Sequence, residues 1–215
     1  MLLFRKNNIC LFCKENNSNI SGYICKDCYG RLEIFHKELE LNSHYIKRIY
    51  YSMGYNRFIR EIIGDYKFKG KNYLYRPLGE IIIETITKND IHKNIDLIMY
   101  IPLHNRKEAI RGYNQAELLG SFIGKKLNIP LSKKNLIKTK WTKEQSHLTK
   151  INRVTNLKDS FEIKSPKEIK GKKILLVDDI ITTGATMEEC ARLLINNGAR
   201  EVRTIALTSS KKGLC

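Results

Sequence analysis

Two neighbouring carboxylates and a short turn of small residues are the groups in this sequence best suited to chemistry. Asp178 and Asp179 are followed closely by the turn Thr182–Thr186, which reads Thr-Thr-Gly-Ala-Thr. Free backbone N–H groups and hydroxyls at the start of a helix bind phosphate, and Gly184 lets the backbone approach a ligand closely. Carboxylates only accept hydrogen bonds, so they suit hydroxyl groups or a hydrated cation. Together these groups predict a sugar phosphate as the ligand.

The elements around these residues would position them for that task. The run Ile174–Val177 is short, apolar and rich in branched residues, which is typical of a strand buried on both faces of a parallel sheet. After the turn, apolar residues recur at helical spacing, and Gly198 stands where a helix cap is expected. In an open α/β sheet, ligands bind outside the carboxyl ends of the strands. The order strand, acids, turn and helix therefore predicts a site at the sheet edge.

The whole stretch Val177–Thr186 resembles the phosphoribosyl-pyrophosphate (PRPP) motif of type I phosphoribosyltransferases. The resemblance implies an α/β, Rossmann-like fold with a mostly parallel sheet flanked by helices. It also implies that Asp178 and Asp179 contact the ribose hydroxyls. The 5′-phosphate would lie on the following loop, made of Thr182, Thr183, Gly184, Ala185 and Thr186. The alternative is a buried strand followed by a solvent-facing acidic pair and a threonine helix cap.

A basic segment follows the predicted strand 96–102. Arg106 and Arg111 lie in it, and arginines at the carboxyl end of a strand can clamp a phosphate group with two parallel hydrogen bonds. A departing pyrophosphate needs such a clamp, together with Mg²⁺ to neutralise the developing charge. We therefore assign Arg106 and Arg111 to a pyrophosphate group. The alternative is a solvated basic loop.

Four cysteines near the start form two Cys-x-x-Cys pairs, Cys10 with Cys13 and Cys25 with Cys28. This spacing predicts a tetrahedral Zn²⁺ site whose ligands are all protein sulfurs, which makes the zinc structural. So short a module cannot bury a core of its own, so metal binding would supply its folding energy. The alternatives are a pair of disulfides or free thiols. Whether the module contacts DNA or only braces the domain stays open.

The layout of the whole chain resembles the ComF family, competence-associated proteins that join a cysteine zinc module to a phosphoribosyltransferase-like domain. The resemblance implies a role in handling incoming DNA during natural transformation, and it assigns residues 139–156 to a mobile lid over the PRPP site. It rests on features that occur in the family's order: the two cysteine pairs, Lys67–Gly70, Pro102 and Leu103 leading to Arg106, the run Arg111–Gln115, and Gln145 to Arg153 followed by Asn156 and Phe161.

The composition indicates which kinds of partner and which compartment to expect. The chain has 215 residues, of which 39 are Lys or Arg and 22 are Asp or Glu, and its formal net charge is +17. Such a surplus favours polyanionic partners, although a lysine-rich genome would also produce it. No apolar run is long enough to cross a membrane, and the first residues lack the order of a signal peptide. We therefore expect a cytoplasmic protein without membrane insertion.

Two domains are expected. Residues 1–46 would form the zinc module and a helical linker, since Leu32, Phe35 and Leu39 have helical spacing, and residues 47–215 would form the phosphoribosyltransferase-like domain. The expected strands of this domain are 49–53, 96–102, 174–177 and 201–208. The expected helices cover about 56–66, 77–87, 116–128 and 187–195.

Two classes of function follow. The first is phosphoribosyl transfer, for which the sequence identifies neither an acceptor nor a catalytic base; a purine- or pyrimidine-type enzyme of nucleotide metabolism is one version of it. The second is a binding module that holds PRPP and single-stranded DNA, with a DNA-uptake helicase or channel protein as a further partner. A PRPP-sensing regulator is a third reading. The residues with charge or rings suited to nucleic acid are Lys67, Phe68, Lys69, Lys140, Trp141 and Lys143.

Overall fold

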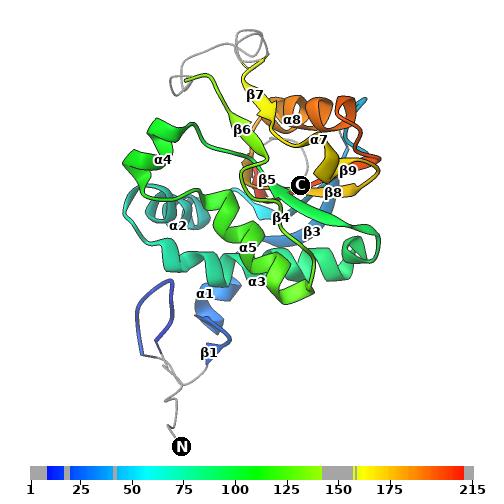
Figure 1. Ribbon diagram of the computed structural model, residues 1–215. Coiled ribbons are helices and arrows are strands. Elements are labelled where there is room, and N and C mark those ends of the chain that lie inside the picture. The colour runs from blue at the N-terminus through cyan, green and yellow to red at the C-terminus, as the bar shows by residue number, and fades with distance from the viewer. Residues whose placement is uncertain (1–8, 17–19, 41–42, 142–156, 158, 211–215) are drawn as a thin grey trace, which may run out of the picture.

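A five-stranded sheet lies at the centre of the chain (Figure 1). In this computed structural model, which describes residues 9–16, 20–40, 43–141, 157 and 159–210, the strand order is β3-β4-β9-β8-β5. Strands β4, β9, β8 and β5 run parallel, and only β3 is antiparallel to its neighbour. The predicted mostly parallel α/β sheet is confirmed. The strands are β3 (Ile34–Leu39), β4 (Arg48–Gly54), β5 (Leu97–Tyr100), β8 (Lys173–Ile181) and β9 (Glu201–Ser209).

Strand β8 lies between β5 and β9 and is buried on both faces. Successive side chains of a strand point to opposite faces. Accordingly Ile174 and Leu176 belong to one hydrophobic cluster, whereas Leu175 and Val177 belong to the other. All four side chains are fully buried. This explains why the sequence shows an unbroken apolar run here instead of an alternating pattern.

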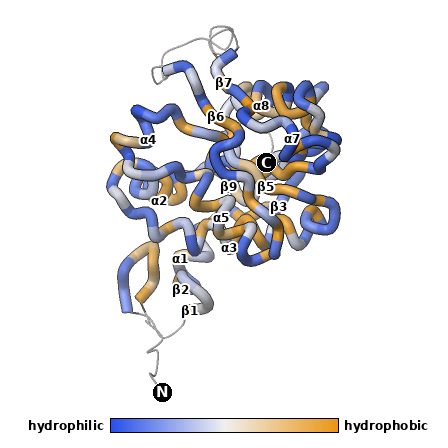
Figure 2. Tube along the Cα trace, viewed as in Figure 1, coloured by the Kyte–Doolittle hydropathy of each residue, from blue (hydrophilic) through white to orange (hydrophobic). Residues whose placement is uncertain are grey.

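Helices cover both faces of the sheet. One cluster joins the sheet to α2, α3 and α5, and the other joins it to α8, α7 and a small hairpin. In Figure 2 the helices alternate between hydrophobic and hydrophilic residues along the chain, as expected for helices with one buried side. The helices are α2 (Arg57–Phe68), α3 (Tyr75–Lys88), α5 (Gln115–Leu127), α7 (Pro166–Ile169) and α8 (Ala185–Asn196), with short 3-10 turns η1 (Asn72–Leu74) and η2 (Ile91–Asn94).

Helix α2 confirms the predicted helix and extends it. Asn56 caps its start, because its side-chain oxygen accepts the N–H of Ile59 at 2.9 Å. The helix continues to Phe68, so Lys67 and Phe68 lie in its last turn and not in a separate basic turn. The side chain of Lys67 therefore starts from a rigid element that packs on the sheet.

A helix that the sequence did not predict occupies the basic segment after β5. Helix α4 (Asn105–Arg111) begins where His104 accepts the N–H of Arg106, and it ends at Gly112, whose φ of 84° is left-handed. None of its residues is buried. The side chains of this segment follow no apolar period, so the sequence favoured a loop. A helix that buries no side chain does not need an apolar period.

The helical linker predicted for residues 31–46 is wrong, since β3 forms there and pairs with β4. The three apolar residues that suggested a helix lie on different sides of the sheet. Leu32 belongs to the cluster under α2, whereas Phe35 and Leu39 pack in the cluster under α8. Leu32 lies before β3, and Phe35 and Leu39 are four residues apart, a spacing that puts them on one face of a strand as well as of a helix.

The N-terminal module packs directly against the main sheet domain. It consists of β1 (Ile20–Ser21), β2 (Ile24–Cys25) and α1 (Lys26–Gly30). The ring of Phe12 meets that of Phe58 in α2 edge to face, with centroids 6.1 Å apart. Module residues thus share a hydrophobic core with α2 and α3. The division of the chain after residue 46 stays a prediction, and β3 of the central sheet lies before that boundary.

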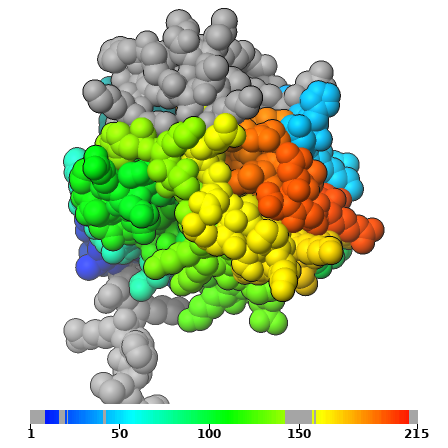
Figure 3. Space-filling view, turned by 45° about the horizontal axis from the view of Figure 1, so that its top comes forward, coloured from blue at the N-terminus to red at the C-terminus, as the bar shows by residue number. Residues whose placement is uncertain are grey.

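A two-stranded hairpin covers the α8 side of the sheet. Strands β6 (Leu136–Lys138) and β7 (Phe161–Ile163) are antiparallel. Figure 3 shows the α4 segment, this hairpin and α8 side by side on one face of the molecule. The predicted lid over 139–156 lies mostly outside the described residues, because 142–156 are not among them. No helix in the described ranges is both long and apolar enough to cross a membrane.

Two helical glycines give a test of the packing. A Cβ on Gly124 of α5 would lie 2.7 Å from the backbone oxygen of Ile129, whereas a Cβ on Gly64 of α2 would meet nothing within 4 Å. We expect Gly124→Ala to destabilise the fold by about 1–3 kcal/mol, because a backbone atom must move. Gly64→Ala should stabilise it by up to about 1 kcal/mol through helix propensity. Urea unfolding of both variants measures the difference, and equal effects would contradict the close approach at Gly124.

Candidate functional site

The acidic pair lies within strand β8 and not beyond it. The predicted strand ended at Val177, but pairing with β9 continues to Ile181 opposite Ser209. Neighbouring strand residues point to opposite faces, so Asp179 faces α2 and Asp178 faces α8. In agreement, the charge of Asp178 adds to burial in raising the pKa of the Cys190 thiol in α8. The two acids therefore leave the strand on different faces, and both still border one cavity.

An ion pair occupies Asp179. The Lys67 ammonium lies 2.9 Å from one carboxylate oxygen of Asp179 and 2.7 Å from the other. The Lys67 and Asp179 side chains are only 20% and 10% exposed. A buried charge is stable only when it is paired, so each of the two charges permits the burial of the other. Lys67 thus serves the acidic site from the end of α2, and its ammonium is not presented on the open surface.

Asp178 is the acid whose negative charge is less favourable in its surroundings. Burial raises the pKa of its carboxyl, and the nearby charge of Asp179 raises that pKa further. Lys67 and the N–H of Asp179, which donates to Asp178 at 2.8 Å, oppose the shift without cancelling it. A carboxyl with a raised pKa beside a cavity is a mark of a functional site. The groups around Asp178 therefore compensate its charge only in part.

A cavity of about 140 Å³ contains both acids. Its other walls come from α2, the connection between β5 and α4, α4 itself and the start of α5. They supply Lys67, Phe68, Ile101, Leu103, Lys107, Arg111, Asn114, Gln115 and Ala116. It is smaller than the roughly 300–1,000 Å³ of most ligand pockets. It adjoins two larger pockets, of about 500 and 940 Å³, with which it shares lining residues. A ligand on the acids would extend into one of these neighbours.

The structure brings one of the two predicted arginines to the acids. Arg111 lines the cavity, donates a hydrogen bond to the side chain of Gln115, and holds its guanidinium carbon 5.1 Å from the centre of the Phe68 ring. Arg106 is exposed in the first turn of α4 and does not line this cavity. The predicted pyrophosphate role thus has a geometric basis for Arg111 and none yet for Arg106.

The predicted phosphate turn follows directly on β8 and starts α8. Gly184 has a φ of 82°, and the Thr183 hydroxyl accepts the N–H of Ala185 at 3.3 Å. Helix α8 is 12 residues long, so its first N–H groups and dipole face an anion placed at this turn. The residues of the turn do not line the 140 Å³ cavity. They follow directly on Ile181, the last residue of β8.

Three residues of this site received no role from the sequence. Lys107 and Asn114 line the cavity, and so does Gln115, which is 2% exposed. The side-chain nitrogen of Gln115 has no hydrogen-bond partner in the part of the chain that the structure describes, and a buried amide of this kind suits a ligand oxygen. The run Arg111–Gln115 was noted, but only its arginine was assigned.

The residues proposed for nucleic acid occupy different surroundings. Phe68 and Trp141 are 68% and 43% exposed and line the same 500 Å³ pocket. Lys69 pairs with Asp65 at 2.8 Å, and Lys140 is exposed. Neither Lys69 nor Lys140 lines that pocket. Lys143 lies outside the described residues. A stacking role for the two aromatic residues stays a prediction.

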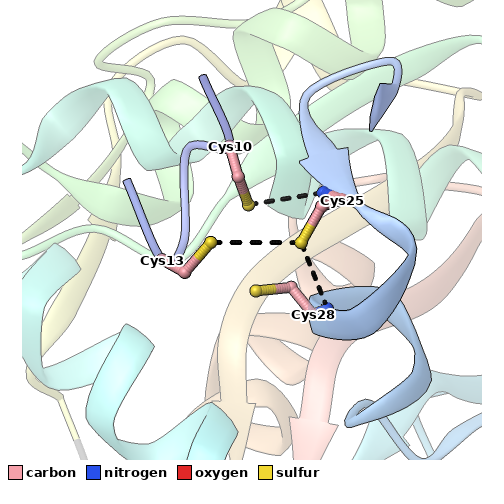
Figure 4. Close-up of side chains that lie close together, drawn as sticks. All are labelled: Cys10, Cys13, Cys25 and Cys28. Carbon is pink, nitrogen blue, oxygen red and sulfur yellow. Dashed lines mark hydrogen bonds between the residues drawn. The ribbon is translucent and has the colours of Figure 1, made fainter. Parts of the chain in front are cut away.

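The four predicted cysteines converge at one point (Figure 4). All four sulfurs lie within 4.8 Å of one another, and those of Cys13 and Cys25 are 3.9 Å apart. A tetrahedral zinc with bonds of about 2.3 Å would separate its sulfurs by about 3.8 Å. Backbone N–H groups of Cys25 and Cys28 donate to the sulfurs of Cys10 and Cys25 at 3.3 and 3.5 Å, which stabilises thiolates. The cluster can therefore hold a metal ion.

Comparison with known proteins agrees with this architecture. Residues 117–214 match the phosphoribosyl transferase domain. Competence protein F of Haemophilus influenzae is 27% identical, over 92% of this chain and 95% of that protein. Competence protein ComFC of Bacillus subtilis is 29% identical, over 97% of this chain and 87% of that protein. DNA utilization protein YhgH of Salmonella typhi is 35% identical, but the match covers 68% of this chain and 65% of YhgH.

The raised pKa of Asp178 predicts a gain in stability when its charge is removed. The folded carboxyl holds its proton above the ordinary aspartate pKa of about 3.9, so the wild type loses stability as pH rises through that interval. We expect Asp178→Asn to be at least about 1 kcal/mol more stable at about pH 8, with a smaller gain at about pH 5. Urea unfolding at both pH values measures this difference.

Glu61→Gln is the control for this measurement. Glu61 forms an ion pair with Arg57 in which both side chains are mostly exposed, so the change should alter stability by less than about 0.5 kcal/mol. A loss of stability in Asp178→Asn that grows with pH would show that the Asp178 charge is compensated in the free protein.

Proposed function

Because this chain belongs to the ComF family of competence proteins, we propose that it binds PRPP with Mg²⁺ and single-stranded DNA during DNA uptake. Its relatives are named for competence and for DNA utilization, and it shares their phosphoribosyl transferase domain. The observation that carries the proposal is the cavity in which Asp178, Asp179 and Arg111 meet. Acceptors for hydroxyls from β8 and a donor for phosphate from α4 converge there.

The geometry supports a division of labour along PRPP. The carboxylates of Asp178 and Asp179 accept the ribose hydroxyls, and the turn Thr182–Thr186 at the start of α8 holds the 5′-phosphate. Arg111 takes the pyrophosphate end, with its guanidinium already oriented by Gln115. We also keep Arg106 as a proposed pyrophosphate contact, since α4 presents it to solvent.

Mg²⁺ fits the donor set of this site. Carboxylate oxygens are its preferred protein ligands, and Asp178 and Asp179 would hold it together with the ligand's own oxygens. When bound, Mg²⁺ neutralises charge on the pyrophosphate. The chain's part is to supply the two carboxylates and to release Asp179 from Lys67, because an oxygen paired with an ammonium is a poorer acceptor for a hydroxyl.

Phosphoribosyl transfer is a second candidate for the same site. The observation in its favour is the 500 Å³ pocket lined by Phe68, Ile110 and Trp141 beside the acids, which has room for an acceptor ring. Release of pyrophosphate from PRPP in the presence of a nucleobase panel tests it. Turnover with a free purine or pyrimidine would favour an enzyme of nucleotide metabolism, and PRPP binding without turnover or DNA binding would favour a PRPP-sensing regulator.

We propose that the cysteine cluster holds one structural Zn²⁺ and that the protein works in the cytoplasm. Four protein sulfurs leave no open position for chemistry, which is typical of structural sites. Cys10, Cys25 and Cys28 are buried in the core shared with α2 and α3. A reducing compartment keeps such thiols available for metal. The ComF resemblance implies a helicase or channel protein of the uptake machinery as a further partner beyond DNA.

The PRPP site is tested by isothermal calorimetry with PRPP and Mg²⁺. We expect the double variant Asp178→Asn with Asp179→Asn to lose measurable PRPP binding, since amides replace the two acceptors, while its circular dichroism spectrum stays that of the wild type. Glu61→Gln, which changes an exposed acid on α2, should bind PRPP normally. Unchanged affinity in the double variant would move the site away from β8.

The zinc site is tested by metal analysis of the purified chain. We expect about one zinc per chain, and we expect Cys28→Ser to lose the metal and to unfold at lower temperature, because binding of structural zinc contributes folding free energy. Cys215→Ser, outside the described residues, should keep the metal. A metal-free wild type with full stability would show that the four cysteines act as thiols.

A further inference from the structure

Three of the large hydrophobic side chains that face solvent gather around one pocket. Phe68 of α2 is 68% exposed, Ile110 of α4 is 84% exposed, and Trp141 is 43% exposed. All three line the same cavity of about 500 Å³. Aromatic and aliphatic surfaces left open to water at a single concave place mark a binding site more often than a folding accident. A pocket whose lining includes two aromatic side chains suits a planar ligand.

The rim of this pocket is cationic. Lys67, Lys107 and Arg111 complete its lining, together with Gly70, and none of the described residues that line it is acidic. The guanidinium of Arg111 lies over the Phe68 ring, with 5.1 Å from its carbon to the ring centre. Rings beside lysine and arginine are the combination that holds an unpaired base and the phosphate next to it. The chemistry of the pocket therefore fits single-stranded nucleic acid.

This pocket is continuous with the cavity of the acids. Four residues line both spaces, namely Lys67, Phe68, Lys107 and Arg111. Three of these four carry the positive charge of the region, and Lys67 is already paired with Asp179. A pyrophosphate group on the acid side and a nucleic-acid phosphate on the aromatic side would draw on the same cations. Two polyanions that share their counter-charges weaken each other's binding.

We propose that one unpaired base of single-stranded DNA stacks between Phe68 and Trp141, that its phosphate binds Lys107 and Arg111, and that it competes there with the pyrophosphate end of PRPP. This inference rests on the proposed function, because it requires that the chain bind both ligands. It adds where the DNA binds, and it adds that each ligand expels the other. The protein would then exchange PRPP for DNA instead of holding both.

The single tryptophan of the chain, Trp141, reports on this pocket directly. Oligothymidylate should quench its fluorescence on binding to the full chain. At constant ionic strength, we expect saturating PRPP with Mg²⁺ to raise the apparent Kd for the oligonucleotide at least tenfold. By reciprocity, the oligonucleotide should weaken PRPP binding in calorimetry by the same factor. Inorganic pyrophosphate with Mg²⁺ should also compete, because the contested groups are those of the pyrophosphate end.

Variants separate the pocket from the rest of the basic surface. Trp141→Ala, followed by anisotropy of a labelled oligonucleotide, should bind DNA about 5- to 150-fold more weakly, the range for loss of one stacked base. Lys107→Gln should reduce the salt dependence of DNA binding by about 0.7 in slope, as expected for one phosphate contact. The controls are Tyr55→Ala, which removes an exposed aromatic elsewhere, and Lys167→Gln on α7, which removes an exposed charge. Both should bind DNA as the wild type does.

Each result bears on the inference alone or on the proposed function. If PRPP and DNA both bind but neither alters the other's affinity, or each strengthens the other, the competition is refuted and the proposed function stands. If free thymine quenches Trp141 while Trp141→Ala leaves oligonucleotide affinity unchanged, the pocket takes a free base and the inference fails. If calorimetry detects no PRPP binding to the wild type, the proposed function itself fails.

Discussion

The buried charge in strand β8 is the constraint on which the site depends. This strand is apolar on both faces as far as Val177 and then places two carboxylates in the same sheet. Carboxylates at such depth need a counter-charge, and Lys67 supplies it from the last turn of α2. The position of α2 on the sheet, its cap at Asn56 and its apolar face therefore serve the acids as much as the core. Lys67 also lowers the pKa of Asp178, but it compensates that charge only in part.

The cysteine module illustrates a related dependence. It has two strands of two residues and one short helix, which is too little to enclose a core. Three of its cysteines and Phe12 instead become part of the cluster formed by α2 and α3, and Arg31 stacks on Phe58, with its guanidinium carbon 3.9 Å from the ring centre. The cysteine cluster and the helix that positions Lys67 thus rest on one shared core. A change in the module reaches α2 through packed side chains.

Elements with a strong apolar period could be predicted from the sequence, and elements without one could not. The run Ile174–Val177 and the helical pattern from Phe58 to Tyr66 correspond to β8 and α2. By contrast, α4 buries no side chain and so leaves no pattern to read. The segment 32–39 shows a spacing that fits a helix as well as a strand, and only the pairing of β3 with β4 shows which one forms. Strand pairing is a long-range contact, and a single sequence does not display it.

The site shows the same division. Its acids, its turn and Arg111 stand in recognisable local order, so the sequence was enough to propose them as site residues, and their roles stay predictions. The partnership of Lys67 with Asp179 joins residues 112 positions apart, and no local pattern announces it. For that reason the sequence suggested only a nucleic-acid contact for Lys67. The orphaned amide of Gln115 is likewise visible only once its burial is known.

The alternation of side chains along β8 makes the length of this strand less tolerant of change than its composition. Exchanging one branched apolar residue for another between Lys173 and Val177 alters packing alone. Deleting or inserting a single residue there would turn every later side chain to the opposite face. Asp179 would then point toward α8, away from Lys67, and Asp178 would take its place opposite α2. The segment therefore tolerates substitutions between apolar residues better than the insertion or deletion of a single residue.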